Sequence, residues 1–111
     1  MLAGQCRLET IEVRDDDQVA RRLPERAHVV MLDAGGRAYD SEAFAAWLEG
    51  RRRGGRDVWF VLGGAFGLDL PRADERLSLG PMTFPHQLAR VLLLEQLYRA
   101  HKILAREPYH L

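Results

Sequence analysis

HVVMLD, at residues 28–33, is a short apolar run bounded by a histidine and an aspartate. Strands of a parallel sheet are covered on both faces, so they appear in a sequence as continuous apolar runs. We therefore predict a buried parallel strand here, ended by Gly35 and Gly36. A second run, DVWFVL at residues 57–62, predicts a second strand of the same sheet.

A helix is expected between these two strands. Ser41 is a favourable N-cap, and Phe44, Trp47 and Leu48 follow it at helical spacing. The glycines at 54 and 55 are expected to end the helix. Strand, helix and strand in this order are typical of an α/β fold with a parallel sheet.

The segment before the first predicted strand has a weaker pattern. RLETIEV, at residues 7–13, is rich in β-branched residues and indicates another strand. Residues 18–26 predict a short helix or turn that stops around Pro24.

The longest predicted element is a helix from Pro85 to Arg106, closed by Pro108. Proline suits its first turn, where the missing N–H has no partner to lose. Before it, residues 70–77 form a short charged segment and residues 78–82 a loop. With 111 residues, the whole chain (1–111) is expected to form one domain.

Parallel sheets of this kind bind ligands outside the carboxyl ends of their strands. The loops after Leu32, Leu62 and Leu79 are therefore the predicted ligand-binding region. The GGAFG sequence at 63–67 lies in one of them, and it is either a tight turn or a cradle for a bound adenosine. It lacks the spacing of a dinucleotide fingerprint or a P-loop.

Four consecutive apolar residues, Val91 to Leu94, point in all directions around the last helix and cannot all face one sheet. A second copy of the same helix is the favoured cover, because two-fold dimers are the commonest oligomers. The alternative is a helix sandwiched within one chain. We expect a homodimer.

Composition excludes several classes of protein. Sixteen basic and sixteen acidic residues give a formal net charge of zero, so a polyanion site must be local. The run at residues 51–56 holds four arginines, which either form a solvated helix end or bind phosphate. The single cysteine, Cys6, and the lack of a signal peptide or membrane-length apolar run favour the cytoplasm.

The four histidines do not have the spacing of a zinc site, so no metal is expected. His28 is expected only to open a strand. His86 and His110 each lie close to a proline at the boundary of an element, where a side chain can face a site. No motif of a nucleophilic hydrolase or a kinase is present.

Three motifs carry a resemblance to a known family. LGGAFGL (62–68), LSLGPMTFPHQLARVLLLEQLYRA (77–100) and PYH (108–110) resemble the RlmH family, the ribosomal RNA large subunit methyltransferases H of the SPOUT class. LDAGGRAYDSEAFA (32–45) matches in the same register, so the resemblance covers most of the chain from about His28 onward.

The resemblance implies an α/β knot, a class in which the C-terminal segment forms a trefoil around an S-adenosylmethionine site. It also implies methyl transfer to N3 of a pseudouridine in the large-subunit rRNA of assembled ribosomes. The residues that match the family's cofactor motifs are Leu32, Gly63, Gly64, Leu79, Gly80, Pro81, Met82, Thr83 and Phe84.

The acceptor nitrogen carries a proton, so a general base or a solvent relay is required, and His86, Tyr109 and His110 are the candidates. The alternative for His86 is that it only caps or orients its loop. Arg90 and Arg99 are the candidate RNA-binding residues. The chain begins at what resembles the family's second strand, so the alternative function is a catalytically impaired, shortened relative that acts as a dimeric cofactor- or RNA-binding module.

Overall fold

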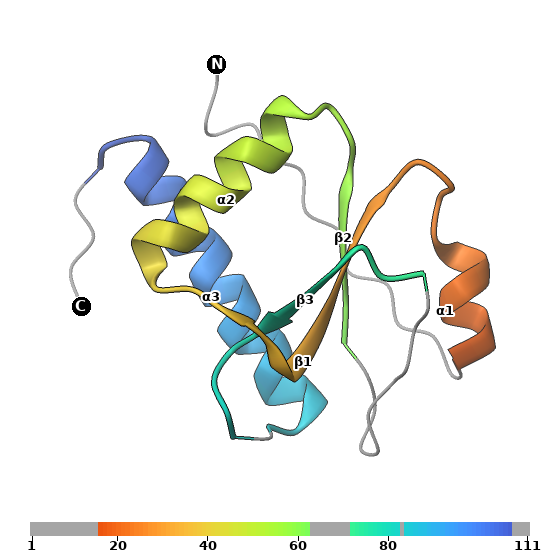
Figure 1. Cartoon of the computed structure of the whole chain (residues 1–111). Coiled ribbons are helices and arrows are strands. Elements are labelled where there is room, and N and C mark those ends of the chain that lie inside the picture. Colours follow the sequence, from red (N-terminus) through yellow and green to blue (C-terminus); the bar gives the residue numbers. More distant parts are fainter. Residues whose placement is uncertain (1–15, 63–71, 83, 108–111) are drawn as a thin grey trace.

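The computed structural model describes residues 16–62, 72–82 and 84–107. Its elements in chain order are α1 (Asp16–Arg22), β1 (His28–Ala38), α2 (Ser41–Arg53), β2 (Val58–Val61), β3 (Glu75–Ser78) and α3 (His86–Leu104). The three strands form one parallel sheet in the order β2-β1-β3 (Figure 1). The prediction of an α/β fold with a parallel sheet flanked by helices is confirmed. The strand predicted at 7–13 lies outside the described residues.

β1 is the central strand, and its apolar run is explained by cover on both faces. Val30 belongs to a core cluster with α2 and α3. Its neighbours Val29 and Met31 point the other way and pack against Val19 and Leu23, in and just after α1. Figure 1 shows α2 and α3 crossing on one side of the sheet and α1 on the other. The described chain therefore forms three layers.

The larger cluster lies between the sheet, α2 and α3. Phe44 of α2 is 4% exposed and stacks on Trp47, with ring centroids 5.5 Å apart and an interplanar angle of 12°. The buried members of this cluster are Val30, Phe44, Ala45, Leu48, Leu77, Leu93, Leu97 and Ala100.

The predicted boundaries of both long helices agree with the structure to within two residues, but the predicted N-cap of α2 was wrong. Asp40 is the N-cap, and its Oδ1 accepts a hydrogen bond from the Ala43 N–H at 2.7 Å. Ser41 is the first helical residue, and its hydroxyl donates to Gln96 of α3 at 3.2 Å. Pro85 immediately precedes α3, as predicted.

The prediction that Gly35 and Gly36 end the first strand was also wrong. β1 continues to Ala38, because an irregularity lets it rejoin β3. Leu32 and Arg37 both pair with Leu77, so the intervening residues bulge out of the ladder. β3 itself was predicted as part of a charged segment and a loop.

Gly36 allows this close approach of the two strands. A Cβ built on it would lie 2.7 Å from the carbonyl carbon of Arg76 and 2.9 Å from the Leu77 nitrogen, which are backbone atoms that cannot rotate away. Gly50, at an exposed position inside α2, has no atom from elsewhere in the described part of the chain within 4 Å of the same position. Replacement by alanine is therefore predicted to change the free energy of unfolding in opposite directions at Gly36 and Gly50.

We expect Gly36→Ala to lower the free energy of unfolding by about 1–3 kcal/mol, because the added carbon forces β1 and β3 apart. Gly50→Ala should raise it by about 0.5–1 kcal/mol, because alanine has the higher helix propensity. Urea unfolding of both variants measures these changes. Equal effects of the same sign would contradict the close approach at Gly36.

Candidate active site

Two of the segments predicted to bind the cofactor meet at the carboxyl edge of the sheet. Leu32 of β1 pairs with Leu77 of β3 in parallel register, and β3 ends one residue later at Ser78. Leu79 and Gly80 therefore leave the sheet beside the chain that follows Leu32. The two segments are far apart in the sequence, and the parallel pairing of β1 with β3 brings them to the same edge.

The third predicted segment also begins at this edge. β2 ends at Val61, which pairs with Met31 of β1, and Leu62 is the last described residue before the glycines. Gly63 and Gly64 themselves lie outside the described residues, as do Thr83, Tyr109 and His110. His86 is the first residue of α3.

The described part of this edge offers apolar surface and an approachable backbone. Leu32, Leu79 and Phe84 are half-buried, while Met82 is 73% exposed. Gly80 has φ of 135°, and among the described residues no atom beyond its chain neighbours lies within 4 Å of the position a Cβ would take. A ligand can therefore approach the Gly80 backbone closely. Apolar side chains beside a closely approachable backbone fit the adenosine and aliphatic portions of S-adenosylmethionine.

Ser78 was missed by the sequence analysis, although it lies between Leu77 and the predicted cofactor loop. Its side chain is buried and hydrogen-bonds to both sides of the carboxyl edge, to Ala34 and to Gly80. A serine at the end of an unpredicted strand gave no signal that could have found it.

The two candidate RNA-binding arginines are not brought together. Arg90 and Arg99 are nine positions apart on α3, which puts them on opposite sides of the helix about 13 Å apart along its axis. Both are half-buried. Arg99 forms an ion pair with Glu95 at 2.7 Å.

The end of α3 carries a residue with a raised pKa. Lys102 donates to Glu107 at 2.6 Å, and this hydrogen bond, reinforced by the charge of the carboxylate, raises the pKa of Lys102. The side chain of Lys102 is partly exposed and lies far along α3 from Phe84, so it contributes nothing to the chemistry at the carboxyl edge.

The opposite, amino-terminal edge of the sheet holds a polar network. His28 opens β1, as predicted, but it is only 6% exposed and its Nε2 hydrogen-bonds with Glu75 of β3. The indole of Trp47 donates to the same carboxylate at 3.0 Å, and Arg51 approaches the imidazole at 3.4 Å. These contacts join β1, β3 and α2, so the cluster holds elements together.

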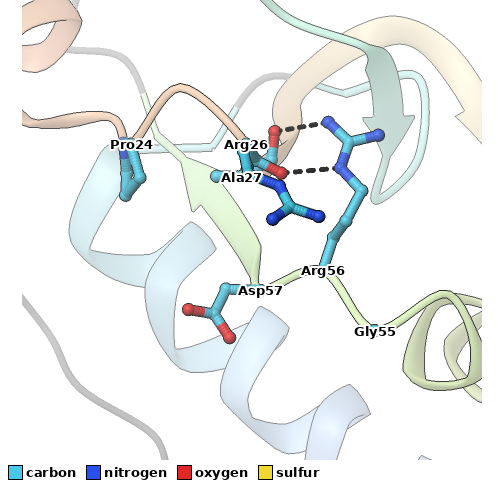
Figure 2. Close-up of a pocket in the computed structure, with 6 residues that line it drawn as sticks. All are labelled: Pro24, Arg26, Ala27, Gly55, Arg56 and Asp57. Atoms are coloured by element: carbon cyan, nitrogen blue, oxygen red, sulfur yellow. Dashed lines mark hydrogen bonds between the residues drawn. The ribbon is translucent and has the colours of Figure 1, made fainter.

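A shallow cavity of about 230 Å³ lies at this same edge, lined by Pro24, Arg26, Ala27, Gly55, Arg56 and Asp57 (Figure 2). Figure 2 shows the Arg56 guanidinium donating to the carbonyls of Arg26 and Ala27, at 2.6 and 2.8 Å. Arg52 and Arg53 both pair with Glu49. The described contacts of these arginines are thus those of a helix end and a loop. They favour the interpretation of the run as a helix end over that of a phosphate-binding site.

Two further features bear on the kind of protein. Among the residues that the structure describes, no helix is long and apolar enough to cross a membrane. Within the same ranges, no three His, Cys, Asp or Glu side chains gather in a way that could hold a metal ion.

The family model described as "Predicted SPOUT methyltransferase" matches residues 3–110. The chain belongs to the SPOUT methyltransferase family. This membership makes it an enzyme by class, and it agrees with the parallel sheet flanked by helices. The knot that the resemblance implies depends in part on segments beyond the described residues, and it stays a prediction.

Curated SPOUT relatives share one name, "Ribosomal RNA large subunit methyltransferase H". The protein of Gluconacetobacter diazotrophicus is 54% identical over 103 residues, which are 90% of this chain and 68% of that protein. Those of Gemmatimonas aurantiaca and Nitratidesulfovibrio vulgaris are 47% and 57% identical, over 92% and 87% of this chain and 68% and 67% of their own lengths. The chain thus spans about two thirds of the length of these relatives.

Proposed function

We propose that this SPOUT methyltransferase transfers a methyl group from S-adenosylmethionine to ribosomal RNA. Its substrate is N3 of a pseudouridine in the large-subunit rRNA of assembled cytoplasmic ribosomes. The relatives' shared name supports the rRNA substrate. The observation that carries the proposal is the parallel pairing of Leu32 with Leu77, because the loop that begins at Leu79 then leaves the sheet at the edge where Leu32 lies.

The proposed cofactor site is built from backbone and apolar groups at this edge. Leu32 and Leu79 supply apolar contact, and Gly80, which has no side chain, lets the cofactor approach the backbone closely. The remaining proposed contacts are Gly63, Gly64, Pro81, Met82, Thr83 and Phe84.

S-adenosylmethionine supplies an activated methyl group when bound. The protein then has to align that methyl with the acceptor nitrogen, and alignment alone can contribute about 7–11 kcal/mol in ideal cases. His86, Tyr109 and His110 are the proposed candidates for accepting the proton of the acceptor nitrogen. The pH dependence of methyl transfer in His86→Gln, Tyr109→Phe and His110→Gln distinguishes them. Arg90 and Arg99 are the proposed contacts to RNA phosphates.

We also propose a homodimer formed through α3. Leu88, Val91 and Tyr98 recur at intervals of three and seven on one face of the helix, and they are 45%, 56% and 54% exposed. Leu93, only two positions from Val91, is buried in the core. The apolar run at 91–94 therefore does point both into the core and away from it, and a second copy would cover the outward face.

Calorimetry with S-adenosylmethionine tests the cofactor. We expect the wild-type protein to bind it and Gly80→Ala to lose most of the affinity, because a side chain is strained at this φ and fills the open approach. Gly55→Ala is a matched control, because Gly55 also has a positive φ, of 75°, and open space around it, but lies at the other edge.

The controls separate the possible outcomes. Gly55→Ala should lose similar stability and keep wild-type affinity for S-adenosylmethionine. No binding to the wild-type chain at millimolar cofactor would contradict the proposed function. Binding without methyl transfer to any ribosomal substrate would favour the alternative, a cofactor- or RNA-binding module without catalysis.

A further inference from the structure

The bulge in β1 lies directly against the proposed cofactor loop. Because Leu32 and Arg37 both pair with Leu77, residues 33–36 have no partners in the strand ladder. Asp33 holds the near side of this bulge: one carboxylate oxygen accepts from the Gly35 N–H at 3.2 Å and the other from Arg76 at 3.2 Å. Neither of these two hydrogen bonds involves the backbone carbonyl of Ala34.

The Ala34 carbonyl is contacted instead by the hydroxyl of Ser78. Ser78 is the last residue of β3 and is 7% exposed. Its hydroxyl lies 3.1 Å from the Ala34 carbonyl and 2.9 Å from the Gly80 carbonyl, so its single proton is donated to one or the other. The same oxygen accepts a hydrogen bond from the Gly80 N–H at 3.0 Å. When the proton is donated to Ala34, this one buried hydroxyl connects the bulge with the loop.

Few other side chains can make this connection. The position requires a donor toward Ala34 and an acceptor toward Gly80 on one atom, and a hydroxyl offers both. Burial limits replacement by solvent, so loss of the hydroxyl leaves the Gly80 N–H and the Ala34 carbonyl without their partner. Gly80, held at a positive φ, would then lose the contact that fixes its orientation.

We propose that Ser78 is a positioning residue that fixes the Gly80 backbone against the β1 bulge and thereby sets the affinity for the cofactor. This inference rests on the proposed function for the identity of the cofactor. The connection between Ser78, Ala34 and Gly80 is a property of the free protein and can be measured without any ligand.

Hydrogen exchange and calorimetry on the full chain test the two parts separately. In Ser78→Ala we expect the Gly80 amide to exchange at least about tenfold faster in the free protein, because its acceptor is gone. We expect S-adenosylmethionine to bind about tenfold more weakly, as the loss of one or two hydrogen bonds implies. Ser78→Thr keeps the hydroxyl and should restore both.

Ser41→Ala is the matched control, because it removes another partly buried serine hydroxyl bond, to Gln96, away from the carboxyl edge. It should leave the Gly80 exchange rate and cofactor affinity unchanged. Unchanged Gly80 exchange in Ser78→Ala would overturn the connection, and faster exchange with wild-type affinity would overturn its role in binding. Failure of the wild-type protein to bind S-adenosylmethionine would instead count against the proposed function, with the exchange result still deciding the connection.

Discussion

Val91→Asp is expected to disrupt the proposed dimer and leave the protein monomeric. Val91 is 56% exposed in the single chain and lies between Leu88 and Tyr98 on the outward face of α3. A dimer through this face would bury the new carboxylate without a counterion, at a cost of about 3–5 kcal/mol. The dimer dissociation constant should therefore rise by about a hundredfold or more. Sedimentation equilibrium over a range of protein concentrations measures this constant.

Ala20→Asp is the control for this prediction, because Ala20 is exposed on α1, on the other face of the sheet. It introduces the same charge and should leave the dissociation constant unchanged. Circular dichroism should show that both variants remain folded. A dimer that tolerates Val91→Asp, or a wild-type chain that is monomeric at all concentrations, would contradict an interface on α3.

Phe44→Ala is expected to lower the free energy of unfolding by about 3–5 kcal/mol, the usual cost of removing a buried aromatic ring. Phe44 is 4% exposed, stacks on Trp47 and belongs to the cluster that joins the sheet to α2 and α3. The cavity left behind would lie between elements that cannot close around it freely. Urea unfolding followed by tryptophan fluorescence measures the loss.

Arg52→Ala, in the last turn of the same helix, is the control. Arg52 is exposed and forms an ion pair with Glu49 at 3.8 Å, so the substitution should cost about 0.5 kcal/mol or less. A loss below about 1 kcal/mol for Phe44→Ala would contradict its place in the main core, since buried aromatic residues rarely cost so little to remove.

The central strand and the last helix could be predicted because their signals are local. HVVMLD is apolar at consecutive positions, as a strand covered on both faces must be, and the structure covers it with α1 on one face and α2 and α3 on the other. Pro85 marks the start of α3 through its own backbone chemistry. Such features depend on neighbouring residues alone.

β3 and the bulge could not be predicted in the same way. β3 has four residues, two of them charged, and it is a strand because its backbone pairs with β1. Gly36 resembles a loop glycine in sequence, and only the contact with Arg76 shows that it permits two strands to approach. Pairing between distant segments determines both features.

Polar contacts over long sequence separations were missed for the same reason. His28 and Glu75 are 47 positions apart, and Ser78 and Ala34 are 44 apart. No local pattern distinguishes these residues from exposed ones. At the carboxyl edge, sequence reasoning and the family resemblance predicted the loops, and the parallel register pairs Leu32 with Leu77, two residues before Leu79. The predicted roles of His86, Tyr109 and His110 stay predictions.

Methyl transfer to ribosomes tests the central claim most directly. Ribosomes that lack the large-subunit pseudouridine methylation are incubated with the protein and methyl-labelled S-adenosylmethionine, and the labelled nucleotide is identified by mass spectrometry. We predict label in the large-subunit rRNA, on N3 of a pseudouridine, and none with Gly80→Ala. A folded, cofactor-binding protein that leaves the rRNA of assembled ribosomes unlabelled would contradict the claim.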